Sequence, residues 1–106
     1  MTTANPLLDN LRKQCGGPRD GALLRFSLGQ ALLAADEHAA AIEELRRAVD
    51  FDPGYSAAWK LLGKACLAHG DQAGAASAWR EGIQAAATRG DKQAEKEMTV
   101  FLRRLA

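Results

Sequence analysis

The chain has 106 residues, of which 47% are hydrophobic and 25% charged, a balance that suits one folded domain over residues 1–106. Its net charge of +1 argues against nucleic-acid binding, which requires an excess of clustered basic residues. No apolar run approaches the roughly 20 residues that span a bilayer, and the start lacks a secretory profile, so we expect no membrane insertion and a cytoplasmic protein.

The first segment carries a short apolar stripe. Leu7, Leu8 and Leu11 fall within residues 5–14, and the glycine-rich stretch that follows them breaks the pattern. We therefore predict that residues 1–21 form an N-terminal cap.

The rest of the chain alternates helical stripes with turn residues. Leu24, Leu28 and Leu32 lie at the spacing of one helical face. Gly70 suits a left-handed helix end, and Asp36 or Asp71 can cap the helix that follows each turn. Helices are predicted near residues 21–35, 38–51, 54–69, 72–88 and 91–105, with Pro53 at the boundary between the second and third.

A fixed offset of 34 residues relates two parts of the sequence. Leu28-Gly29 recurs as Leu62-Gly63, and Ala41 recurs as Ala75. A glycine inside a helix costs about 1 kcal/mol relative to alanine, so both glycines predict that another helix passes close to the backbone. A period of this length is typical of a solenoid, in which each helix pair stacks on its neighbour.

The second copy carries a known signature. Residues 59–66 have the pattern W-x-x-L-G-x-x-C, and residues 75–79 follow with A-x-x-x-W. These motifs resemble the tetratricopeptide repeat, whose usual pattern has tyrosine at the cysteine position. The resemblance implies two helix-turn-helix units, 22–55 and 56–89, the first being a weaker copy with Arg25 where tryptophan is usual.

The last segment, residues 90–106, is expected to be a C-terminal capping helix. Met98, Phe101 and Leu105 share one face, and charged residues occupy the others. A solenoid needs such caps and about three repeats for stability, so this chain is near the minimum and self-association would stabilise it.

The resemblance also implies a concave groove that binds a protein or peptide, lined by the first helix of each unit. Lys60 and Lys64 lie one helical turn apart, so a partner's carboxylate could contact both, although an ordinary solvated face is the alternative. The groove positions that we predict to contact a partner are Leu23, Phe26, Gln30, Leu33, Lys60, Lys64 and Leu67.

The apolar half of this groove leaves two hypotheses. Leu23, Phe26 and Leu33 are suited either to binding an apolar segment of another protein or to being covered, by the N-terminal segment of the chain or by a second copy in a homodimer. The chaperone-tail clamp of some tetratricopeptide proteins is not expected, because it needs groove asparagines and both asparagines here lie outside the units.

Catalysis, metal binding and cofactor binding have no support in the sequence. His38 and His69 are far apart in the sequence with no accompanying ligand spacing, and Cys66 occupies a packing position, where cysteine behaves as a small hydrophobe. We predict a protein that is not an enzyme and that holds no metal or cofactor.

Overall fold

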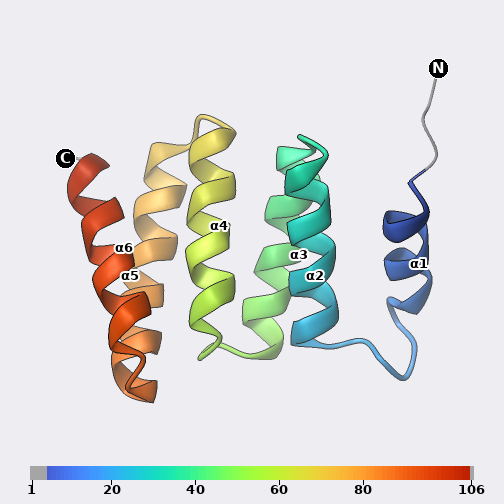
Figure 1. Cartoon of the computed structure of the whole chain (residues 1–106), viewed down its shortest axis with the longest axis horizontal. Coiled ribbons are helices and arrows are strands. Elements are labelled where there is room, and N and C mark those ends of the chain that lie inside the picture. The colour runs from blue at the N-terminus through green and yellow to red at the C-terminus, as the bar shows by residue number, and fades with distance from the viewer. Residues whose placement is uncertain (1–4, 106) are drawn as a thin grey trace.

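The computed structural model describes residues 5–105, and within this range it contains α-helices and no strand (Figure 1). The predicted all-α fold with paired helices is therefore confirmed. The first four residues of the predicted N-terminal cap and the last residue of the predicted C-terminal cap lie outside the described range. The helices are α1 (Pro6–Gln14), α2 (Ala22–Ala34), α3 (His38–Phe51), α4 (Ser56–Ala68), α5 (Gln72–Arg89) and α6 (Lys92–Leu105).

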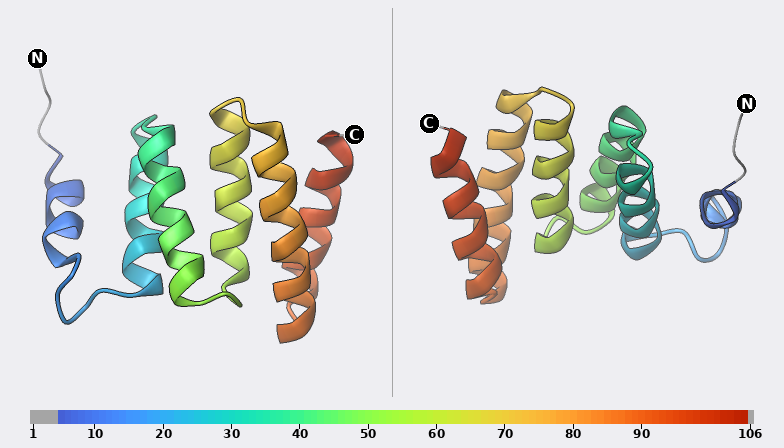
Figure 2. Two further views of the ribbon diagram at one scale, coloured as in Figure 1. Left: turned by 180° about the vertical axis from the view of Figure 1, so that it is seen from behind. Right: turned by 45° about the horizontal axis from the view of Figure 1, so that its top comes forward.

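The helices form two layers. Helices α2, α4 and α6 lie side by side in what we call the front layer, and α3 and α5 form the back layer (Figures 1 and 2). The α2–α3 hairpin lies within residues 22–55 and the α4–α5 hairpin within residues 56–89, and α1 lies beside α2 at the N-terminal end of the row. The resulting molecule is elongated, with extents of 40 × 31 × 18 Å.

Two glycines allow the helices of each hairpin to approach closely. A Cβ atom on Gly29 would lie 2.6 Å from Leu45 Cγ and 3.4 Å from the carbonyl oxygen of Ala41. A Cβ on Gly63 would collide with the indole ring of Trp79. The predicted close approach is thus confirmed in both units, and the nearest neighbours, Leu45 and Trp79, occupy equivalent positions of the repeat.

The core runs along the interface between the layers. Its largest fully buried side chains include Leu28, Leu32, Leu45, Cys66 and Met98. Alanines pack between them with no exposed surface, which lets the thin helices come close. This packing carries apolar contacts from the first hairpin through to α6.

The turn between the helices of each hairpin matches the sequence prediction in one unit and differs in the other. Gly70 has the left-handed φ of 83°, and Asp71 Oδ1 accepts the Gly74 N–H at 2.8 Å, as predicted. Asp36 does not cap α3: it occupies the position equivalent to Gly70, with φ 59°, and the N-cap residue is Glu37, without a side-chain capping bond. The prediction that Asp36 caps this helix is therefore wrong.

Helix α4 begins at Ser56, two residues later than predicted. The side chain of Asp52 accepts the Gly54 N–H at 3.1 Å, and its carbonyl accepts the Tyr55 N–H at 3.0 Å. Asp52 thereby closes a turn that delays the helix.

Candidate functional site

The seven predicted contact residues come from two neighbouring helices of the front layer. Four of them lie on α2 and three on α4, so the stacking of the hairpins brings the two halves of the predicted groove side by side. On α2 these residues are Leu23, Phe26, Gln30 and Leu33, and on α4 they are Lys60, Lys64 and Leu67.

The apolar half on α2 is less accessible than its composition suggests. Leu23 is 70% exposed. Phe26, by contrast, packs its ring against Tyr55 with 5.1 Å between ring centroids, and Leu33 packs against the core. Leu23 is therefore the residue of this half that offers most apolar surface.

The basic half on α4 is partly matched by α6. Lys60 Nζ lies 3.1 Å from Glu97 Oε2, so the chain itself supplies the carboxylate that we expected from a partner. Lys64 Nζ lies 5.1 Å from the centroid of the Phe101 ring, a cation–π contact that leaves the lysine exposed. The two ammonium groups therefore have different partners instead of sharing one, and Lys64 is the more available.

A pocket of about 560 Å³ opens between α4, α5 and α6, and we call it the α4–α6 pocket. Its volume lies within the range of ligand pockets. Apolar side chains dominate its lining, two basic residues border it, and among the described residues no carboxylate lines it. The lining residues are Lys64, Leu67, Ala68, Gln72, Trp79, Phe101, Arg104 and Leu105.

Trp79 anchors this pocket to the core. It is 2% exposed, its Nε1–H donates to the carbonyl oxygen of Lys60 at 3.1 Å, and its ring lies 5.3 Å from that of Phe101. Because the ring is fixed by packing and by a hydrogen bond, the pocket wall is pre-formed. Trp79 is thus both a buried core residue and part of the pocket lining.

Helix α6 provides pocket residues that the sequence analysis missed. Phe101, Arg104 and Leu105 line the α4–α6 pocket, whereas residues 90–106 were expected only to cap the solenoid. The apolar stripe of this segment was recognised as a packing face. Periodicity alone does not separate the residues of this stripe that pack against the core from those that also line a pocket.

A second polar feature, which we call the Arg25 cluster, lies in the first unit. Arg25 Nε and Nη2 each donate to a carboxylate oxygen of Asp20 at 2.8 Å, and Nη1 donates to Glu44 Oε2 at 2.8 Å. The three side chains are only 10–14% exposed. At the positions equivalent to Arg25 and Glu44, the second unit has Trp59 and Ala78, so an ionic pair in the first unit corresponds to two apolar residues in the second.

The Asp20 carboxyl of the Arg25 cluster makes the stability of the protein depend on pH. Hydrogen bonds from Arg25, and then from the Gly16 N–H, hold the pKa of Asp20 well below its ordinary value. A carboxyl group with a lowered folded-state pKa contributes stability above its unfolded pKa of about 4 and loses it as the pH falls.

When the pH is lowered from about 6 to about 3, Asp20→Asn is expected to lose less of its free energy of unfolding than the wild type loses. Urea titrations of both proteins at the two pH values measure this difference. Equal losses in the two proteins would contradict this assignment.

The cysteines and histidines give no sign of a reactive centre. Cys66 is buried, and this burial raises the pKa of its thiol. The rings of His38 and His69 lie 6.4 Å apart, and over residues 5–105 no three or more His, Cys, Asp or Glu side chains are arranged to hold a metal ion. Within the same range, no helix is both long and apolar enough to cross a membrane.

Comparison with known proteins decides the family. The sequence pattern of the tetratricopeptide repeat matches residues 22–65. A tetratricopeptide repeat-containing protein of Pseudomonas aeruginosa is 57% identical over 99 residues, which cover 93% of this chain and 94% of the relative. The chain belongs to the tetratricopeptide repeat family.

Solved structures support the same assignment for this tetratricopeptide repeat protein. The solution structure of a Bordetella parapertussis protein is 46% identical, with a TM-score of 0.80, and the match covers 96% of this chain and 89% of the other. MamA shares the fold at 23% identity, with a TM-score of 0.68 and coverage of 92% and 64%. Tetratricopeptide repeats generally mediate protein–protein interactions and are typically non-catalytic.

Proposed function

We propose that the chain binds a segment of another protein along the front layer and that the α4–α6 pocket is the anchoring point. The observation that supports this proposal best is the chemistry of the pocket, in which Leu67, Phe101 and Leu105 supply apolar surface next to two cations. A pocket of this kind buries an apolar side chain and orients it through a few charged contacts.

The proposed partner segment carries an apolar side chain with a carboxylate beside it. Lys64 and Arg104 border the pocket and attract the carboxylate, and arginine can bind it through two parallel hydrogen bonds. Lys60 contributes less, because Glu97 already neutralises it at 3.1 Å. The proposal therefore transfers the basic part of the site from the Lys60–Lys64 pair to Lys64 and Arg104.

A charge reversal at the pocket tests this proposal. The double variant Lys64→Glu/Arg104→Glu is expected to weaken partner binding by at least about tenfold, because two charge-assisted contacts become repulsive. Partners captured from the source cell are identified by mass spectrometry, and the affinity of the purified partner is then measured for each variant.

The matched control is Lys92→Glu/Lys96→Glu, which makes the same charge change on exposed positions of α6 that do not line the pocket. This control is expected to bind within about twofold of the wild type, since exposed charges distant from a binding site contribute little. Equal binding by the pocket variant and the control would refute the proposed anchoring point.

A second copy of the chain is the alternative occupant of the groove. A second copy that covered Leu23, which is 70% exposed, would remove its apolar surface from water, and this gain supports the candidate. If the alternative holds, light scattering during size exclusion should give the mass of a dimer for the wild type and of a monomer for Leu23→Glu. A wild-type monomer at high concentration removes the alternative.

A further inference from the structure

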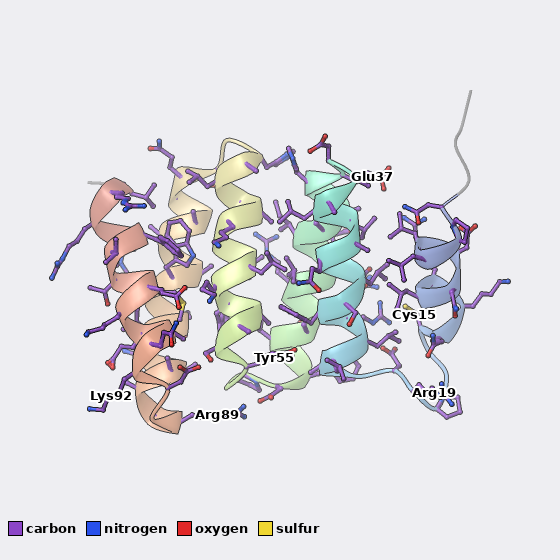
Figure 3. All side chains as sticks on the ribbon, in the orientation of Figure 1. Cys15, Arg19, Glu37, Tyr55, Arg89 and Lys92 are labelled. Atoms are coloured by element: carbon purple, nitrogen blue, oxygen red, sulfur yellow. The ribbon has the colours of Figure 1, made fainter. Side chains whose placement is uncertain are left out.

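Helix α1 covers an apolar surface at the N-terminal end of the solenoid. Leu8 is 5% exposed and forms a buried cluster with Leu28 and Leu32 of α2 and Ala41 of α3. Cys15 packs against this cluster and lies between α1 and α2 in Figure 3. Without α1, these side chains would form an exposed apolar face, which we call the N-terminal face.

The contacts that hold α1 are few. Leu8 is its only buried residue, Leu7 on the same helix is 59% exposed, and the helix has nine residues. A helix of this length is not stable in water without tertiary packing. Its ion pair from Arg12 to Glu37 is long, at 3.8 Å, and about half exposed, so it contributes little. Local opening of α1 is therefore expected to cost less free energy than global unfolding.

The Arg25 cluster restrains the connection between α1 and α2. Asp20 Oδ2 accepts the backbone N–H of Gly16 at 2.8 Å and the Nη2–H of Arg25 at 2.8 Å. Glu44 of α3 binds the other side of the same guanidinium. One carboxylate thus ties the start of the connection to the first helix pair, in the manner of a latch.

We propose that α1 is a latched cap over a second helix-binding surface, and that the N-terminal face, once opened, accepts α1 from another copy of the chain. The choice of a second copy rests on chemical identity, because α1 of another molecule makes the same contacts with Leu28, Leu32 and Ala41 that α1 makes within its own chain. This surface is formed by the N-terminal face and not by the α4–α6 pocket, so it does not depend on the groove function.

Amide hydrogen exchange tests the latch in the intact protein. In the wild type, amides of α1 are expected to exchange faster than core amides of α4, because α1 opens on its own. Asp20→Asn removes the ionic bond to Arg25 and is expected to accelerate exchange in α1 by about tenfold, which corresponds to about 1.4 kcal/mol. Exchange at Leu62 and Cys66 in α4 should change much less.

Glu43→Gln is the matched control, since it removes one negative charge from an exposed position of α3 next to Glu44. It is expected to leave exchange in α1 within about twofold of the wild type. The latch is refuted if α1 and α4 exchange at one rate in the wild type, or if Asp20→Asn accelerates both equally.

A shortened connection tests the second copy as occupant. Deleting residues 16–18 removes about 10 Å of reach between α1 and α2, which opposes closure within one chain and favours exchange between chains. The expected species is a dimer by light scattering, with α1 amides still protected. A monomer with unprotected α1 amides would show that the N-terminal face does not bind a second copy.

Discussion

Replacing Arg25 with alanine is expected to lower the free energy of unfolding by about 3 kcal/mol, because the carboxylates of Asp20 and Glu44 lose their shared cation in a largely buried setting. The guanidinium makes three hydrogen bonds of 2.8 Å to these two groups. Urea denaturation followed by far-ultraviolet circular dichroism measures the change.

The sequence of the second unit suggests a second substitution that restores stability to a variant lacking Arg25. The double variant Arg25→Trp/Glu44→Ala reproduces the Trp59 and Ala78 pair at equivalent positions. Replacing a buried ionic group with well-packed apolar side chains is often neutral or stabilising, so the double variant should recover part of the stability lost in Arg25→Ala, although Asp20 still lacks its cation. It should also release α1, since Asp20 no longer has its arginine.

Arg47→Ala is the control for this series. Arg47 is 54% exposed and lies 3.4 Å from Glu44, and an exposed pair of this kind contributes less than about 1 kcal/mol. If Arg25→Ala unfolded at the same urea concentration as Arg47→Ala, the Arg25 cluster would contribute no more to the stability of the protein than an exposed ion pair does.

The helices and their pairing could be predicted because they depend on local pattern. Gly29 and Gly63 recur at one offset, and each permits a close helix contact that the structure confirms. The wrong prediction at Asp36 also has a local cause: one residue of offset separates the left-handed position from the capping position, and aspartate is suited to either.

The Arg25 cluster and the α4–α6 pocket could not be predicted from the repeat pattern, because their members come from different helices and from segments outside the two repeats. Asp20 lies outside the repeat that contains Arg25, so the periodic pattern gives no reason to pair them. Glu97 neutralises Lys60 across 37 residues, and only the position of α6 in the front layer brings them together. Sequence periodicity identifies the helices, whereas the charge pattern of the groove depends on how the last helix packs.

Trp79→Ala should produce the largest loss of stability in the second unit, about 3–5 kcal/mol, which is the range for removing a buried aromatic side chain from a core. The indole fills the space that Gly63 leaves, donates to Lys60 and contacts Phe101. Its loss should therefore loosen the contacts among α4, α5 and α6 together. Urea denaturation measures the change, and a loss below about 1 kcal/mol would contradict the assigned role.

Phe101→Ala separates the two roles of this region, because Phe101 is only partly buried and lines the α4–α6 pocket beside Lys64. The truncation is expected to cost less stability than Trp79→Ala, but to weaken partner binding at least as much as the charge reversal does. If Phe101→Ala bound the partner as tightly as the wild type while remaining folded, the apolar part of the pocket would not be the anchoring point. If it lost binding and kept its helical content, the packing of α6 against α4 would be what creates the site, since neither hairpin alone supplies both the apolar surface and the second cation.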